Sequence, residues 1–177
     1  MDWVAQSFRM KKDSQLPAKV SVHPAGNDFF TTMPCLLPSD KERFGVKVVS
    51  RILGRTPSLS SDILLYNSAN GELLALINAD WITSMRTGAV ATLAIKTLRS
   101  SSARKYSFIG LGNTARATLL CLLSSFPDEI FQVVLFRYKD QAEYFIDYFR
   151  TFGNVVFSVV DTMEELVEDA DVLVSCI

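Results

Sequence analysis

The chain has 177 residues, of which 49% are hydrophobic and 21% are charged, and its formal net charge is −1. This composition is typical of a soluble globular protein with one good core and part of a second, and the small net charge indicates neither nucleic acid nor an anionic membrane as a partner. No apolar run approaches the ~20 residues of a membrane span, and residues 1–12 lack the apolar block of a secretory signal.

The cysteine and histidine residues indicate the cellular compartment and whether a metal site is expected. Cys35, Cys121 and Cys176 are odd in number, widely spaced and set among apolar residues. This pattern predicts reduced thiols and a cytoplasmic protein. The single histidine, His23, has no partners at ligand spacing, so no metal site is predicted.

The first hundred residues are predicted to form a mixed or antiparallel sheet followed by a helix. Short β-prone runs cover residues 20–23, 29–33, 46–49, 63–67 and 72–77. Asn70-Gly71 separates the last two runs and is a strong hairpin signal. Residues from Asp80 to Leu98 show helical spacing, and Ser100 to Ser102 break the pattern. We place the domain boundary near Arg99–Ala103, giving domains of residues 1–99 and 100–177.

The remaining residues alternate between apolar strands and helical patterns. Strands are expected over residues 106–109, 131–136, 155–160 and 172–177, and helices after residue 112, over 140–149 and after Thr162. Thr162 and Glu165 have the spacing of a capping box at a helix start. Such alternation predicts an α/β fold with a Rossmann-type, doubly wound parallel sheet.

The most informative motif is the glycine turn between the first of these strands and its helix. Gly110 permits a sharp turn, Gly112 lets a pyrophosphate approach the backbone, and Ala115 lets the helix lie close to the strand. The phosphates would lie where the amides of Asn113 and Thr114 point. A purely structural glycine turn is the alternative for the motif taken alone.

Basic residues follow the second strand of this unit. An NAD-binding unit usually has Asp or Glu there for the ribose hydroxyls, whereas this chain has Arg137-Tyr138-Lys139. The cluster can donate to a 2′-phosphate, so it favours NADP(H) over NAD(H). The alternative is that Arg137 and Lys139 are solvated loop charges.

The helix over residues 80–98 carries a second candidate site. Arg86 and Thr87 offer a guanidinium and a hydroxyl to an anion, and small residues from Gly88 onward leave a surface for close packing. Helix packing with an exposed, paired arginine is the alternative interpretation.

Together these features resemble the ornithine cyclodeaminase/mu-crystallin family. The run from Met85 to Ala91 follows an Asn-Gly hairpin and begins about two dozen residues before the glycine turn. Further matching segments fall in the family's order, so the resemblance covers almost the whole chain; they are residues 18–20, 33–34, 45–49 and 170–174.

The resemblance implies an N-terminal domain built on a mixed sheet that binds a small amino or imino acid and forms a homodimer, followed by a Rossmann domain that holds NAD(P). Its members include cyclodeaminases, alanine dehydrogenases and ketimine reductases. By position, Lys47 resembles the lysine that meets the substrate near the reacting carbon. Its apolar strand neighbours lead us to expect a desolvated amine with a lowered pKa; a strand lysine that reaches solvent is the alternative.

The resemblance implies further roles and agrees with those argued above for the glycine turn and Arg137. Arg86 resembles an arginine between substrate carboxylate and cofactor, and Lys19 stands where the family generally has a carboxylate-binding arginine. The expected cofactor-binding residues are Ser58, Arg86, Thr87, Gly110, Gly112, Asn113, Thr114, Ala115, Arg137 and Ser175. Ile177 departs from the family pattern, because it replaces a threonine beside the nicotinamide.

The family's catalytic aspartate lies beyond the fourth Rossmann strand, where this sequence stops. We therefore expect the given chain to be a fragment, a split gene product or an incompletely described protein, with nucleotide binding at best and little turnover. The alternative function is that of a non-catalytic, mu-crystallin-like protein that binds a small ligand in an NADPH-dependent way.

Overall fold

A computed structural model describes all residues 1–177, which divide into two compact units, Asp2–Thr83 and Ser84–Ile177, with Met1 grouped with the second. The first unit begins with α1 (Asp2–Met10) and contains the strands β1 (Val20–Val22), β2 (Phe29–Leu36), β3 (Arg43–Arg51), β4 (Leu59–Asn67) and β5 (Leu73–Asn78). Two short 3-10 helices, Lys11–Asp13 and Ser39–Lys41, complete it. The helix α2 (Asp80–Leu98) starts in the first unit and continues into the second.

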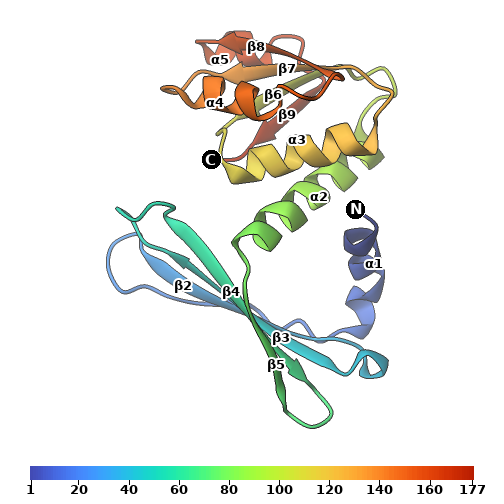
Figure 1. Ribbon diagram of the computed structural model, residues 1–177, viewed down its shortest axis with the longest axis vertical. Helices are drawn as coiled ribbons and strands as arrows, with labels where there is room; N and C mark the ends of the chain where they lie inside the picture. Colours follow the sequence, from blue (N-terminus) through green and yellow to red (C-terminus); the bar gives the residue numbers. More distant parts are fainter. The chain divides into compact units, whose positions relative to one another are not determined.

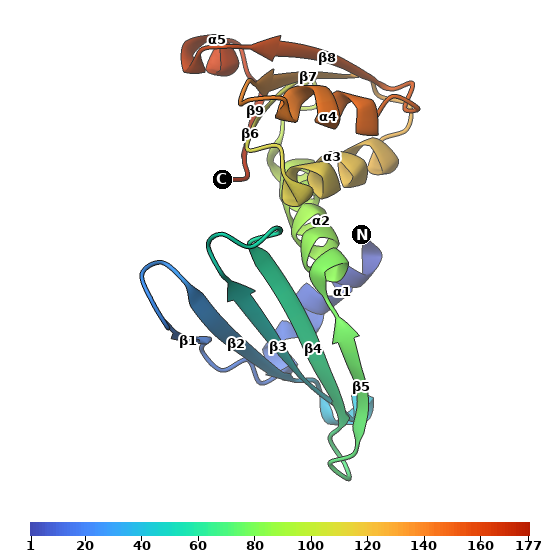
Figure 2. The ribbon, with the colours of Figure 1, turned by 60° about the vertical axis from the view of Figure 1, so that its left-hand side comes forward.

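The strands of the first unit form one antiparallel sheet in the order β1-β2-β3-β4-β5 (Figure 2). The expectation of a mixed or antiparallel sheet resolves to the antiparallel form. Most strands extend beyond their apolar runs, since ladder pairing continues at polar positions such as Arg43, paired with Asn67, and Ser60, paired with Ser50. The predicted hairpin is confirmed between β4 and β5, where Gly71 has a φ of +77°.

Three neighbouring side chains near the middle of this sheet are shielded from solvent. Thr31, Val49 and Ser61 are buried neighbours on β2, β3 and β4. The carboxylate of Asp80 at the start of α2 accepts hydrogen bonds from the amide of Ser61 at 2.5 Å and from its hydroxyl at 3.4 Å. These bonds satisfy polar groups that burial would otherwise leave unpaired.

The second unit is a parallel sheet with helices. Its strands are β6 (Lys105–Ile109), β7 (Phe131–Phe136), β8 (Val155–Val160) and β9 (Val172–Ser175), in the order β8-β7-β6-β9. The connecting helices are α3 (Asn113–Ser125), α4 (Gln141–Tyr148) and α5 (Met163–Val167) (Figure 1). Counted within this unit the strand order is 3-2-1-4, so the predicted doubly wound sheet is confirmed.

Close packing fixes the helices of this unit. Its core includes the fully buried side chains of Tyr106, Phe108, Leu119, Leu122 and Phe145. The predicted capping box at α5 is also confirmed: the amide of Glu165 donates to Thr162 Oγ1 at 3.2 Å, and the amide of Thr162 donates to the Glu165 carboxylate at 3.3 Å.

The unit boundary lies earlier than the expected one at Arg99–Ala103, because α2 from Ser84 onward packs within the second unit. Gly88 packs on the backbone of Ala117, and the Thr92 hydroxyl donates to the carbonyl of Thr118 at 3.3 Å. After α2, the guanidinium of Arg99 makes a two-pronged ion pair with Glu129, with distances of 2.6 and 2.9 Å. The division into a substrate domain and a nucleotide domain stays a prediction.

None of the helices combines the length and the apolar character that crossing a bilayer requires. The three cysteines are unpaired, and burial raises the thiol pKa of each.

Candidate functional site

A hollow of about 640 Å³ opens at the carboxyl edge of the parallel sheet. It is lined by the glycine turn after β6, by the end of β7, by the starts of α4 and α5, and by the last two residues of the chain; the lining residues are Ile109, Gly110, Leu111, Gly112, Phe136, Tyr138, Gln141, Met163, Cys176 and Ile177. Open α/β sheets bind ligands outside the carboxyl ends of their strands, beside the point where the strand order reverses. Here that point lies between β6 and β9, next to this hollow.

Gly110 is fixed as glycine by two separate features. Its φ is +76°, in the left-handed region that side chains disfavour. A Cβ at this position would also lie 2.8 Å from the carbonyl carbon and oxygen of Cys176. The predicted sharp turn is therefore present, and its backbone lies against the residue that follows β9.

Gly112 is different, because space rather than strain defines it. Its φ is −80°, which any residue adopts, and a Cβ built there would meet nothing within 4 Å. Gly112 is the N-cap of α3, and no side chain caps that helix. The amides of Asn113, Thr114 and Ala115 therefore have neither an intrahelical acceptor nor a side-chain cap. An open backbone beside three unpaired amides is a suitable place for an anion.

Arg86 and Thr87 lie close to this helix start. The crossing of α2 and α3 at Gly88 and Ala117 is two residues beyond Arg86 and four beyond Asn113. At a rise of about 1.5 Å per residue, both positions fall within roughly one helical turn of the crossing. The side chain of Arg86 is exposed and has no ion pair, so its guanidinium is available to a ligand.

Arg137 forms ion pairs with two acidic residues from other parts of the second unit. Its Nε lies 2.7 Å from Oδ1 of Asp161, which follows β8, and its Nη1 lies 2.9 Å from Oε1 of Glu143 on α4. Asp161, and to a lesser extent Glu143, holds the pKa of Arg137 above its usual value. The absence of an acid after β7 is thus compensated by two acids from other elements. Neighbouring parallel strands end at the same edge of a sheet, so the position of Asp161 directly after β8 was the sequence signal that could have predicted its pairing with Arg137.

The three candidate residues of the first unit lie on or beside its sheet. Lys47 is half-buried on β3, between Met33 of β2 and Ile63 of β4. Lys19 directly precedes β1, on the other side of β2, and is exposed. Ser58 is exposed in the turn between β3 and β4, and its carbonyl accepts a hydrogen bond from the amide of Ile52 at 2.9 Å.

Ser175 ends β9 opposite Ile109 and is exposed at the carboxyl edge of the sheet. Ile177 lines the hollow but is 95% exposed. Ala115 is fully buried, as close helix–strand packing requires. In the second unit, the sheet edge thus gathers the glycine turn, the start of α3 and Ser175, with Arg137 at the end of β7.

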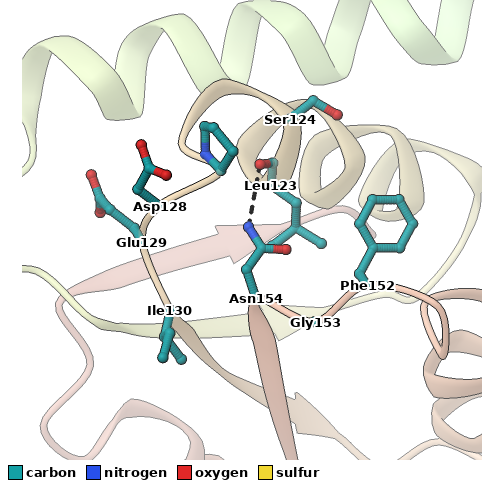
Figure 3. A pocket seen from close by; sticks show the side chains of 9 residues that line it. Leu123, Ser124, Asp128, Glu129, Ile130, Phe152, Gly153 and Asn154 are labelled. Carbon is teal, nitrogen blue, oxygen red and sulfur yellow. Dashed lines mark hydrogen bonds between the residues drawn. The ribbon is translucent and has the colours of Figure 1, made fainter.

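A second hollow, of about 550 Å³, lies at the opposite edge of the parallel sheet (Figure 3). Two of its polar side chains have partners: the Asn154 amide donates to the carbonyls of Leu123 at 3.3 Å and of Phe126 at 3.4 Å, and Glu129 pairs with Arg99. Because the dashed bond in Figure 3 ties the β8 start to α3, this hollow is a structural junction.

The 3-2-1-4 parallel sheet, the glycine turn and the uncapped α3 define a Rossmann-type, dinucleotide-binding class of fold. A sequence model described as the ornithine cyclodeaminase/mu-crystallin family matches residues 1–177. The chain belongs to this family.

Individual relatives agree with this assignment. A Δ1-pyrroline-2-carboxylate reductase of Bacillus cereus is 28% identical over 141 residues, which are 76% of this chain and 42% of that protein. The Thermococcus litoralis Δ1-pyrroline-2-carboxylate reductase, solved with NADH and L-proline, is 27% identical, with a TM-score of 0.87 over 98% of this chain and 55% of that one. An archaeal alanine dehydrogenase dimer with bound NAD is 28% identical, with a TM-score of 0.85 over 98% and 54%. The chain spans about half the length of these relatives.

Proposed function

We propose that this chain is part of an NAD(P)-dependent oxidoreductase or deaminase that acts on a small amino or imino acid, of the cyclodeaminase, alanine dehydrogenase or ketimine reductase type. The observation that carries the proposal is the uncapped start of α3 beside the open backbone of Gly112. The family membership and the nicotinamide cofactors named for its structural relatives support it.

The hollow at the sheet edge fits a dinucleotide. The amides of residues 113–115 would bind the diphosphate, with Arg86 and Thr87 donating from α2. Phe136, Tyr138 and Met163 offer apolar surface to the adenosine half of the molecule. Ser175, at the end of β9, would donate to the nicotinamide end, and Ser58 would face the cofactor.

Substrate handling is assigned to cationic side chains. Arg86 and Lys19 would hold the substrate carboxylate, and Lys47 would exchange a proton with the substrate next to the reacting carbon. When bound, the nicotinamide accepts or supplies the hydride. Lysine in place of arginine at position 19 keeps the charge but loses the two-pronged donor geometry, so we expect weaker carboxylate recognition there.

Three finer assignments complete the proposal. NADP(H) is favoured over NAD(H), because Arg137 offers positive charge at the end of β7. The protein acts as a homodimer, as the dimeric alanine dehydrogenase does. It works in the cytoplasm, in agreement with its three unpaired cysteines.

The alternative is an NADPH-dependent small-ligand binder without turnover, of the mu-crystallin kind. Lys19 and Ile177 favour it, because both depart from the family residues expected around substrate and nicotinamide. The two functions differ in whether bound nucleotide is consumed.

The test is a titration of the 177-residue chain with NADH and NADPH, followed by nucleotide fluorescence. We expect saturable binding of both, with NADPH the tighter ligand. Nicotinamide absorbance is then followed after adding a cyclic imino acid such as Δ1-pyrroline-2-carboxylate. Consumption supports the enzyme and contradicts the binder, and failure of both nucleotides to bind contradicts the proposal. Binding without consumption agrees with both functions, because little turnover is expected from these 177 residues alone.

A further inference from the structure

Arg137 is held by two carboxylates that come from two different elements. Asp161 follows β8, and Glu143 lies in the first turn of α4; each accepts one hydrogen bond from the guanidinium, at 2.7 and 2.9 Å. The backbone supports the arrangement, because the amide of Arg137 donates to the carbonyl of Val160 at 2.9 Å. The ends of β7 and β8 are thereby joined next to the ion pairs.

This three-residue cluster, Arg137-Asp161-Glu143, borders the hollow at the sheet edge. Phe136 and Tyr138, the chain neighbours of Arg137, line the hollow. Gln141 and Met163 also line it, and they stand two residues from Glu143 and Asp161. In a Rossmann unit, the end of the second strand faces the adenosine ribose. The cluster therefore lies at the position where a Rossmann unit distinguishes the 2′-hydroxyl of NAD(H) from the 2′-phosphate of NADP(H).

The cluster is open to exchange with a ligand. The side chains of Arg137, Glu143 and Asp161 are 45%, 58% and 70% exposed, so their ion pairs are solvated and a bound phosphate can compete with them. Only Nε and Nη1 of the guanidinium have partners, which leaves Nη2 as a donor. Oδ2 of Asp161 has no partner and can accept a bond from a ribose hydroxyl.

Resting on the proposed function, we infer that Asp161 and Glu143 are specificity-determining residues that oppose Arg137. The two carboxylates repel a 2′-phosphate and keep part of the guanidinium occupied, while Asp161 supplies the ribose acceptor that is missing after β7. Arg137 raises the affinity for NADP(H) relative to NAD(H), and the two acids lower it. The balance is set by three residues rather than by Arg137 alone.

The experiment measures the dissociation constants of NADPH and NADH for the wild-type chain, Asp161→Asn and Glu143→Gln, at low and high salt. Both replacements keep the side-chain shape and remove one negative charge. Asp147→Asn is the matched control, because it removes the acid of another exposed ion pair of the second unit, with Arg150 at 2.9 Å, away from the hollow. Thermal unfolding of each variant checks that the fold is retained.

We expect Asp161→Asn and Glu143→Gln each to raise the affinity for NADPH relative to NADH by about threefold to tenfold at low salt, with a smaller effect at high salt. Asp147→Asn should leave this ratio unchanged. An unchanged ratio in both variants, with both nucleotides still bound, overturns the inference but not the proposed function. Absence of any binding to the wild-type chain overturns both.

Discussion

Gly88 of α2 lies against the backbone of Ala117 in α3: a Cβ at residue 88 would stand 2.5 Å from the carbonyl carbon of Ala117 and 2.6 Å from the amide nitrogen of Thr118. No side chain fits between the two helices at this point. The contact sets the distance between Arg86 and the start of α3, and it therefore determines whether both can act on one diphosphate. A glycine that first indicates only helix packing is thus part of the candidate site.

Gly88→Ala is expected to destabilise the second unit. The methyl group would meet backbone atoms, which cannot rotate away, so the helices must separate; overpacking of this kind costs about 1–3 kcal/mol or more. Thermal or urea unfolding measures the loss. Gly153→Ala is the control, because a Cβ there meets nothing within 4 Å and the residue has no positive φ. Equal unfolding midpoints for the two variants would contradict the packing account.

The two glycines of the turn should respond in opposite ways. Gly110→Ala should lower the melting temperature, since it combines a φ of +76° with a clash at Cys176. Gly112→Ala should leave the melting temperature close to that of the wild type but weaken NADH binding about tenfold or more, because its methyl would occupy the open approach to the α3 amides. Melting curves and nucleotide titrations of both variants decide the matter. Full nucleotide affinity in folded Gly112→Ala would show that the diphosphate lies elsewhere.

The Arg99–Glu129 pair gives a pH dependence with a defined sign. The Arg99 hydrogen bonds hold the pKa of Glu129 below its usual value, and the Arg99 side chain is only 9% exposed. Because the folded pKa lies below the unfolded one, the pair stabilises the fold above the unfolded pKa of about 4.3 and loses this effect as the pH falls through the folded pKa.

Glu129→Gln should therefore cost about 1–3 kcal/mol at pH 7, and the difference from the wild type should shrink as the solution is acidified below pH 4. Glu143→Gln, which removes the acid of a well-exposed ion pair, should cost much less. Melting temperatures across this pH range provide the measurement. A gap that stays constant with pH would mean that the ion pair contributes nothing.

Arg137→Asp should shift nucleotide preference towards NADH, because it replaces the cation at the end of β7 by a third carboxylate beside Asp161 and Glu143. We expect the ratio of NADPH to NADH affinity to fall by about tenfold or more. Paired titrations of the variant and the wild type test this. An unaltered ratio would remove Arg137 from the account of cofactor choice.

Much of the fold could be predicted from local patterns. The 3.6-residue period predicts α2 with the observed bounds of Asp80 and Leu98, and Asn70-Gly71 and Thr162–Glu165 mark a hairpin and a helix start through their own backbone chemistry. Strand lengths were underestimated, because ladder bonds at Arg43 and Ser60 depend on a partner strand rather than on hydrophobicity. The unit boundary lies before the expected Arg99–Ala103 for a similar reason. Gly88 and Thr92 pack α2 against α3, which follows more than twenty residues later in the sequence.

The candidate site shows the same division. The spacing of Gly110 and Gly112 predicts the turn. The structure adds that Gly110 is required by its backbone conformation, whereas Gly112 leaves open space beside the backbone. The partners of Arg137 could not be read from its neighbours in sequence, because Asp161 lies 24 residues away and reaches it only through the pairing of β7 with β8. The substrate roles of Lys19 and Lys47 stay predictions.

The central claim is that one diphosphate is bound jointly by the start of α3 and by Arg86. The most direct measurement is the NADH affinity of the wild type, Arg86→Gln, Gly112→Ala and the double variant, with Lys96→Gln as a control that removes another exposed cation from α2. We predict a loss of about tenfold or more for each single variant, a combined loss smaller than the product of the two, and no loss for Lys96→Gln. Wild-type affinity in Arg86→Gln, with the protein folded, would contradict the account.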